Sequence, residues 1–508
     1  MGFFVDGWEL TSLVERCAMS EILTLQGMSL LVGGTLAGIL VGAVPGLTGA
    51  MLIALTLPFT FQLGGPMALI LLVAMYVGAV SGGLITATVL RIPGTPASMV
   101  TTLDGYPMAQ AGQGQKALSL GVCASFVGGM VSFVALALMA KPVASWSTYL
   151  GPFEFFGLVL LALVLMASVG GASLIAGLLS GVFGMVLALP GMSPATGELR
   201  WTLGIPEMAD GFKLLPVLLG LFAVNEVLRG MGVRAQRASA LDISRRPLGL
   251  KGLGLRRHGL NALRSSLLGT WVGVLPGVGA NIGSILAYGV AKRFSKRPEQ
   301  FGQGAEEGIV ASESANNATV GGALIPLISL GIPGSVIDAI LLGALVIHGL
   351  QPGPLLFTNH PEIVNVVVAT FFFANVVMFG FMLLASPWVA RLGRLPSWFL
   401  LPTIITVCVV GCYSLGNRMF DVWVMFCFGG IGFLMERFSI PLAPFVIGFV
   451  LAPLAEESLG SGLMASGGSF LPLVSRPISF SLILIALVLL LMPLLRRVWA
   501  RCCAEKKG

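Results

Sequence analysis

Residues 34–50 read GTLAGILVGAVPGLTGA, and residues 269–281 read GTWVGVLPGVGAN. Each stretch joins a GxxxG spacing to a Pro-Gly pair, Pro45-Gly46 in the first and Pro276-Gly277 in the second, and the offset between the two pairs is 231 (276−45 and 277−46). Proline removes a helix hydrogen bond, so both stretches predict a broken helix. In a membrane protein, matched breaks in two halves of the chain are typical of a transporter whose substrate site lies near the middle of the bilayer.

The composition of the chain indicates a lipid environment. Of 508 residues, 56% are hydrophobic and only 10% are charged, whereas a soluble domain carries about 25% charged residues. We therefore predict an all-α, multi-pass integral membrane protein with about ten to twelve transmembrane helices, some of them broken or re-entrant.

A second pair of motifs extends the repeat. Ser81-Gly82-Gly83-Leu84-Ile85 is followed by Ile92-Pro93-Gly94-Thr95, and Gly321-Gly322-Ala323-Leu324-Ile325 is followed by Ile332-Pro333-Gly334-Ser335. The offset is 240 here (322−82 and 333−93), and the order of motifs is the same in both halves. We predict an internal duplication, inverted in the membrane if each repeat has an odd number of spans.

The charge distribution predicts the organisation of the halves. Residues 229–264 hold nine Lys and Arg against one acid, Asp242, which predicts a basic cytoplasmic linker by the positive-inside rule. Residues 1–228 would form the first transmembrane half, and residues 265–508 the second half with an extra C-terminal helix. The net charge of +7 follows from such loops and requires no nucleic-acid partner.

The first pair of breaks supplies candidate substrate contacts. A helix that restarts after a break presents unpaired N–H groups and the positive end of its dipole, which suit an anion. The alternative is a pair of kinked helices packed through glycine with no ligand, and the duplication favours the functional interpretation. The candidate residues are Pro45, Gly46, Thr48, Gly49, Pro276, Gly277, Gly279 and Asn281.

The run Ser312-Glu313-Ser314-Ala315-Asn316-Asn317-Ala318-Thr319 is the densest polar segment in an apolar region. Hydroxyls and carboxamides can donate to a carboxylate or offer oxygens to Na+. We assign substrate binding to Ser314, Asn316, Asn317 and Thr319, and ion coupling to Glu313, since a buried carboxylate must pair or protonate. The alternative is an interfacial helix cap.

The second pair of breaks offers further candidates. Thr95 and Ser335 follow the two Pro-Gly pairs and are assigned to substrate binding, while Asp338, among apolar neighbours, is assigned to ion coupling. Asp104 is read as part of an ordinary turn in Leu103-Asp104-Gly105-Tyr106-Pro107.

The remaining ionisable residues suggest no catalytic chemistry. His258 is expected in solvent within the linker, and His348 and His360 in loops or at the interface, so we expect no metal site and no cofactor. The chain has no P-loop, HExxH or GxSxG motif, so energy for transport would come from an ion gradient.

Five of these motifs, in order, resemble the large membrane subunit, TctA, of the tripartite tricarboxylate transporter family, over residues 20–495. They are Pro45-Gly46-Leu47-Thr48-Gly49, Ile92–Ala97 with Leu103–Pro107, Pro276–Asn281, Glu313–Ala318 and Leu330–Ser335.

The resemblance implies a non-enzymatic permease that imports citrate or related carboxylates across the bacterial inner membrane, driven by a Na+ or H+ gradient. It implies a small membrane subunit (TctB-like) and a periplasmic solute-binding protein (TctC-like) as partners, and it allows a homo-oligomer. It also implies an elevator-type fold like that of the ion-transporter superfamily.

Two other functions are weighed against this one. An ion or proton exchanger without an organic substrate is the alternative, although few acids lie within the spans. An intramembrane hydrolase pairing Ser81 with His348 lacks the local motif that such an enzyme needs.

Overall fold

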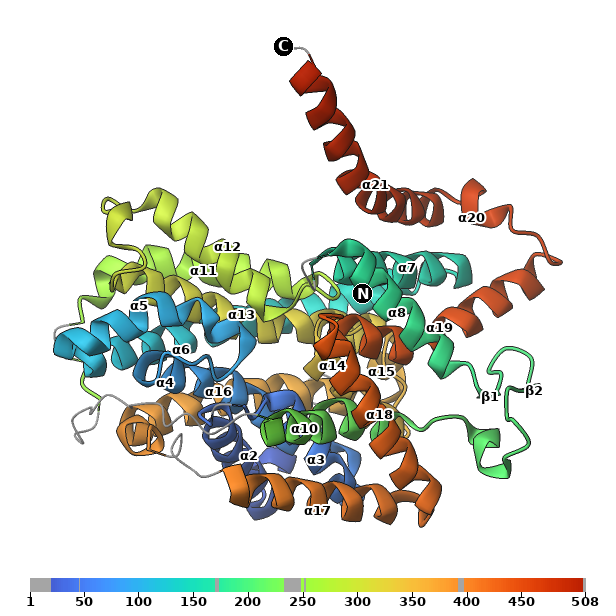
Figure 1. Cartoon of the computed structure of the whole chain (residues 1–508), viewed down its shortest axis with the longest axis horizontal. Coiled ribbons are helices and arrows are strands. Elements are labelled where there is room, and N and C mark those ends of the chain that lie inside the picture. The colour runs from blue at the N-terminus through green and yellow to red at the C-terminus, as the bar shows by residue number, and fades with distance from the viewer. Residues whose placement is uncertain are drawn as a thin grey trace, which may run out of the picture. The chain divides into compact units, whose positions relative to one another are not determined.

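The computed structural model describes residues 20–44, 46–169, 173–232, 248–250, 253–391 and 397–505, and these are almost entirely helical (Figure 1). The helices of the first repeat and its continuation are α2 (Leu25–Gly42), α3 (Gly49–Thr60), α4 (Gly65–Val89), η1 (Pro96–Met99), α5 (Thr101–Met108), η2 (Ala109–Gln113) and α6 (Gly114–Ser147). Those from α7 to α10 are α7 (Pro152–Val169), α8 (Leu174–Ala188), η3 (Pro206–Asp210), α9 (Leu214–Leu218), η4 (Leu219–Val224) and α10 (Asn225–Gly232).

The second repeat comprises α11 (Leu255–Val274), α12 (Gly279–Phe294), η5 (Pro298–Gln300), α13 (Glu306–Leu330) and α14 (Val336–Ile347). After it come α15 (Pro354–Asn359), α16 (Pro361–Val389), α17 (Ser397–Gly416), α18 (Met419–Arg437), α19 (Leu442–Ala465), α20 (Pro472–Ser475) and α21 (Pro477–Glu505). The described strands are β1 (Gly191–Met192) and β2 (Leu199–Arg200), an antiparallel ribbon.

These helices confirm an all-α membrane architecture. Within the described residues, seven helical segments are long and apolar enough to cross a bilayer, and six shorter apolar helices of 10–17 residues accompany them. The apolar stretch 153–189 forms the two helices α7 and α8.

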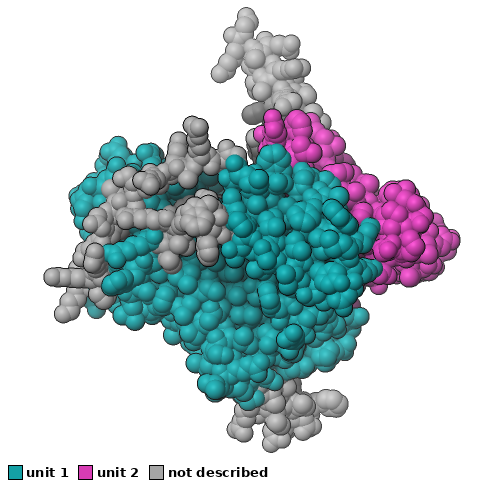
Figure 2. Space-filling view, turned by 60° about the horizontal axis from the view of Figure 1, so that its bottom comes forward, with its two compact units in different colours: residues 1–145, 215–275, 279–433 teal, residues 146–214, 276–278, 434–508 magenta. Residues whose placement is uncertain are grey.

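The chain divides into two compact units (Figure 2). The first contains residues 1–145, 215–275 and 279–433, and the second contains residues 146–214, 276–278 and 434–508. Both repeats contribute to the first unit, so the compact units do not follow the division of the sequence into residues 1–228 and 265–508.

The linker predicted for residues 229–264 is helical at both of its ends. Helix α10 extends to Gly232 and α11 begins at Leu255. Residues 233–247, 251 and 252 lie outside the described part of the chain, and the cytoplasmic side of the linker stays a prediction.

The helix breaks of the first motif pair are confirmed. Helix α2 ends at Gly42 and α3 starts at Gly49, while α11 ends at Val274 and α12 starts at Gly279. Pro45 lies outside the described residues. Gly46 and Gly277, which follow the two prolines, have φ values of 86° and 77°, a left-handed backbone that glycine adopts without strain.

The internal duplication is visible in the packing of the first unit. Gly42 on α2 lies so close to α4 that a side chain there would collide with the carbonyl oxygen of Ala79. Gly273 on α11 stands in the same relation to the carbonyl oxygen of Thr319 on α13. The offsets, 231 for the glycines and 240 for their partners, are those of the two motif pairs.

Three further close approaches obey the same offsets: Gly38 on Met75 with Gly269 on Ala315, Gly82 on Ile39 with Gly322 on Thr270, and Gly94 on Gly42 with Gly334 on Gly273. Each repeat is therefore a broken helix packed backbone to backbone on the helix that follows it, with small residues at the contact as in other membrane bundles. The inverted orientation of the repeats stays a prediction.

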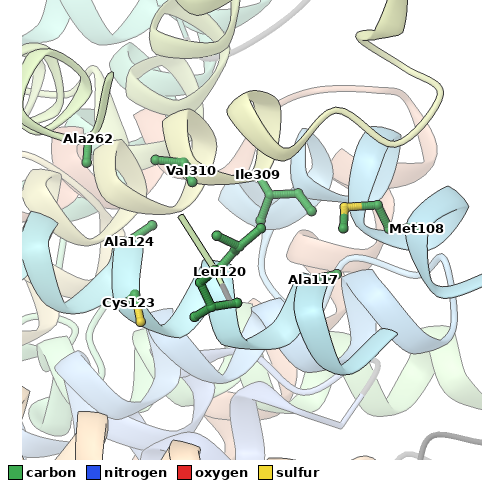
Figure 3. Close-up of a cluster of buried hydrophobic side chains, with 9 residues drawn as sticks. Met108, Ala117, Leu120, Cys123, Ala124, Ala262, Ile309 and Val310 are labelled. Atoms are coloured by element: carbon green, nitrogen blue, oxygen red, sulfur yellow. The ribbon is translucent and has the colours of Figure 1, made fainter. Parts of the chain in front are cut away.

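An apolar cluster joins the ends of α5, α6, α11 and α13 (Figure 3). Leu120 and Ala124 of α6 pack with Ile309 and Val310 of α13. Because Ser125 follows Ala124 and Glu313 lies one helical turn after Val310, this cluster fixes the positions from which both side chains reach the site.

The second unit is built from α7, α8, α19, α20 and α21 and includes the β1–β2 ribbon. Close glycine contacts join α8 and α19, where Gly184 lies on Phe445 and Gly448 on Gly181. Arg476, the residue before α21, forms an ion pair with Glu154 of α7, with 3.1 Å between Nη1 and Oε2.

Candidate functional site

Helix α13 carries the polar run and is buried along nearly its whole length. Residues 312–319 lie in its interior, more than one turn from either end, and all are buried. The alternative interpretation of this run as an interfacial helix cap is therefore wrong.

Glu313 is the charged centre of this run. Its side chain is fully buried, and its Oε1 accepts a hydrogen bond from Thr101 Oγ1 at 2.6 Å while its Oε2 accepts one from Ser125 Oγ at 3.2 Å. Thr101 Oγ1 also lies 2.9 Å from Ser312 Oγ. Hydroxyl donors from α5 and α6 thus replace the water that this carboxylate loses on burial.

The two asparagines join α13 to α4, the corresponding helix of the other repeat. Ser81 Oγ donates to Asn317 Oδ1 at 2.6 Å, and Asn317 Nδ2 donates to the carbonyl of Glu313 at 3.2 Å. Asn316 Nδ2 reaches the carbonyl of Val80 only at 3.5 Å, and its Oδ1, fully buried, has no hydrogen-bond partner. The Asn316 side chain also neighbours the Glu313 carboxylate. Asn316 therefore keeps a free acceptor oxygen and a weakly held N–H, whereas Asn317 is engaged within the protein.

Ser314 and Thr319 bond to their own helix. Ser314 Oγ donates to the carbonyl of Val310 at 2.6 Å, and Thr319 Oγ1 donates to that of Asn316 at 2.6 Å. Such back-bonding satisfies a hydroxyl proton inside a membrane helix while leaving oxygen lone pairs free.

The second break of the first repeat ends in a closed cap. Ser98 Oγ lies 3.1 Å from the backbone nitrogen of Thr95 and donates to the carbonyl of Thr95 at 2.8 Å. Both side chains are buried, and together they form a reciprocal capping box at the start of η1.

The corresponding break of the second repeat carries a charge. Ser335 caps α14, its Oγ accepting from the backbone nitrogen of Asp338 at 3.4 Å, and the Tyr76 hydroxyl lies 3.3 Å from the same Oγ. Asp338 is fully buried, and neither of its carboxylate oxygens makes a hydrogen bond of good geometry. Its polar neighbours are the Tyr76 and Ser335 hydroxyls and the backbone N–H groups of Ser335 and Asp338.

The first breaks contribute less polar contact than the sequence suggests. Thr48 caps α3, with its Oγ1 accepting from the backbone nitrogen of Met51 at 3.1 Å. Gly49 packs against Ala79 and Ile337. In the second repeat, Gly277 packs against Met166 of α7, while Gly279 has open space beside it and Asn281 is exposed.

Asp104 and His258 are placed differently from their predictions. The segment 103–107 is part of helix α5 and not a turn, and Asp104 is buried there. Its Oδ1 accepts from the backbone nitrogens of Gly302, Gly304 and Ala305 at 2.8–2.9 Å, so it anchors the loop before α13. Turn-forming composition was misleading because the partners of Asp104 lie about 200 residues away in sequence.

His258 is also placed differently from the prediction. It is 4% exposed on α11, and its Nε2 lies 3.0 Å from Glu306 Oε2, so it is not a solvated linker residue. His348 lies 3.1 Å from Thr60 Oγ1 and His360 lies 3.1 Å from Glu362. Ser81 and His348 thus have other partners, and among the described residues His, Cys, Asp and Glu form no group of three or more that could hold a metal ion.

Comparison with known proteins decides the family. The tripartite tricarboxylate transporter TctA family model matches residues 28–447. The chain belongs to this family. It is a membrane transport protein and a component of tricarboxylate transport. The family's name refers to a tripartite transporter, which implies further subunits.

Two relatives are similar in sequence to this chain, one over most of its length and one over a part. An uncharacterized 52.8 kDa protein in the TAR-I ttuC' 3'region of Agrobacterium vitis is 35% identical over 463 residues, which are 91% of this chain and 92% of that protein. An uncharacterized protein in the TAR-II ttuC' 3'region of the same organism is 38% identical over 232 residues, 45% of this chain and 96% of that protein. Among solved structures, the transmembrane domain of a cyanobacterial bicarbonate transporter, BicA, matches with 16% identity and a TM-score of 0.20, covering 80% of this chain and 97% of that one.

Proposed function

We propose that this chain is the large permease subunit of a secondary active importer of tricarboxylates or related carboxylates in the bacterial inner membrane. The observation that carries the proposal is the buried polar interior of α13, set in a duplicated frame of broken helices. The Asn316 amide N–H, 3.5 Å from its acceptor on Val80, and the helix start at Ser335 offer the amide, hydroxyl and backbone donors that carboxylates accept from.

The donors proposed for the site are neutral amide, hydroxyl and backbone groups, and they favour a negatively charged substrate. Neutral donors at helix starts can hold a carboxylate and release it again, whereas a buried Lys or Arg would bind it more permanently. The buried carboxylates Glu313 and Asp338 are the two candidates for the site of the coupling ion, Na+ or H+, because a buried acid needs a cation, a proton or strong hydrogen-bond donors as its partner.

The proposed assembly has three parts. A small membrane subunit (TctB-like) would accompany this chain, and a periplasmic solute-binding protein (TctC-like) would deliver the carboxylate. This division of labour is inferred from the family. It would leave much of the substrate selection to the binding protein and the translocation step to the buried site.

The test is uptake of labelled citrate and related acids into proteoliposomes that contain the chain and its partner subunits, with and without a Na+ or pH gradient. Gradient-dependent accumulation is expected for at least one acid. Asn316→Ala and Asn317→Ala should abolish uptake while the protein remains folded in the membrane, and Asn359→Ala, an exposed amide, serves as the matched control. Normal uptake by both variants would remove the α13 run from the site.

The alternative, an ion or proton exchanger without an organic substrate, rests on the same two buried carboxylates. It predicts cation flux in liposomes that contain this chain alone, with no stimulation by any carboxylate. Carboxylate uptake coupled to the gradient contradicts it.

A further inference from the structure

We infer that Asp338, with the hydroxyls of Tyr76 and Ser335, is the binding site of the coupling cation, a Na+ ion or a proton, and that Glu313 is held by its own hydroxyl donors and does not bind that cation. This inference rests on the proposed function and separates two acids that the sequence treats alike.

The first step is the contrast in hydrogen bonding. Glu313 accepts from Thr101 and Ser125. Asp338 is equally buried, yet no donor makes a hydrogen bond of good geometry to its Oδ1 or Oδ2. A fully buried carboxylate without such a donor is strongly destabilising unless a cation or a proton neutralises it.

The second step is the position of Asp338 in its helix. It is the third residue after Ser335, from which an acid commonly reaches back to the backbone N–H of the cap. In this chain the backbone N–H of Ser335 is a neighbour of the Asp338 carboxylate, but neither carboxylate oxygen makes a hydrogen bond of good geometry. A capping role alone therefore leaves the carboxylate unexplained.

The third step is the surroundings. Helices α3, α4 and α13 pack against α14. Helix α3 has no ionisable side chain, α4 contributes Tyr76, and α13 contributes Glu306, Glu307 and Glu313. Near α14, Gly334 packs on Ala323, ten residues or about 15 Å along α13 from Glu313. No Lys or Arg lies on α14 or on any of these three helices, so no basic side chain of these four helices neutralises Asp338.

The fourth step is the donor set. The two carboxylate oxygens of Asp338 neighbour two hydroxyl oxygens, that of Tyr76 from the first repeat and that of Ser335 from the second. Such an all-oxygen group suits a hard cation such as Na+. The same carboxylate, protonated, could donate to either hydroxyl. In the first repeat, the positions that match Ser335 and Asp338 by the offset of 240 are Thr95 and Ser98, which satisfy each other. Of the two corresponding helix caps, only the cap of the second repeat contains an acidic residue, Asp338.

The test is cation binding by the full chain, purified in detergent, which requires no carboxylate transport. The unfolding temperature of the wild type should rise as NaCl replaces choline chloride at constant ionic strength, or, if the cation is a proton, as the pH is lowered without Na+. Ligand binding to the folded state produces such a shift.

Asp338→Asn should abolish the response to the cation, and Tyr76→Phe should move its midpoint to a higher Na+ concentration while the protein folds normally. Glu362→Gln, which removes an acid that is 43% exposed, should respond like the wild type. If Asp338→Asn does not fold, the Tyr76→Phe midpoint decides. A wild type that responds to neither cation, or an Asp338→Asn or Tyr76→Phe variant that responds like the wild type, would overturn the inference. Since citrate uptake is measured separately, its absence would count against the proposed function and not against this site.

Discussion

The second breaks of the two repeats share a frame and differ in chemistry. Gly94 and Gly334 lie on the backbones of Gly42 and Gly273 in the same way. Yet the first break closes with the neutral pair Thr95 and Ser98, and the second with Ser335 and the buried acid Asp338. The comparison teaches that the duplication supplies geometry, and that function comes from the residues in which the copies diverge.

The largest effect is expected where the copies agree. Gly42→Leu and Gly273→Leu should each destabilise the protein by about 3 kcal/mol, since the new side chain meets a backbone carbonyl that cannot move aside. The measurement is the fraction of monodisperse protein after detergent extraction and heating. Gly289→Leu, at a helical glycine with open space beside it, is the control. A Gly273→Leu protein as stable as this control would contradict the backbone-to-backbone packing of α11 on α13.

A smaller effect is expected on the donors of Glu313. Thr101→Val removes a hydrogen bond to a buried carboxylate, and we expect carboxylate uptake to fall about tenfold, the equivalent of one charge-assisted bond. Thr102→Val is the neighbouring control, because the Thr102 hydroxyl bonds to the carbonyl of Met99 in its own segment. Equal uptake by the two variants would mean that Glu313 does not depend on its hydroxyl donors.

The smallest effect distinguishes the two caps. Thr95→Ala and Ser335→Ala should each lower stability by about 1 kcal/mol through loss of a helix cap. Only Ser335→Ala should also weaken the response to Na+ or to pH, since only that hydroxyl adjoins Asp338. The measurement is the unfolding temperature with and without Na+, and a matching loss of response in Thr95→Ala would make the two caps functionally alike.

The sequence predicted those parts of the molecule that leave a local pattern. The offsets of 231 and 240 predicted an internal duplication, and the glycine contacts obey the same offsets. The polar run 312–319 is buried within α13, while its role in binding stays a prediction. Helix breaks were read correctly from Pro-Gly pairs.

Residues whose role depends on distant partners were not predictable in this way. Tyr76 and Ser125 are single polar residues in apolar helices, and nothing around them in the sequence indicates a neighbour more than 180 positions away. The repeat held one unused signal, because Tyr76 matches Asn316 by the offset of 240. Asp104 and His258 were misjudged since their neighbours in sequence are typical of turns and basic loops, whereas tertiary contacts bury them.

We propose that the charged break of the second repeat couples transport to a cation. The most direct test compares two activities of Asp338→Asn in proteoliposomes with the partner subunits: accumulation of labelled citrate driven by a Na+ or pH gradient, and exchange of labelled for unlabelled citrate at equal cation concentrations. The account predicts that accumulation is lost and exchange is retained, while Ser98→Ala, the matching position of the first repeat, keeps both. Gradient-driven accumulation by Asp338→Asn at the wild-type level would contradict it.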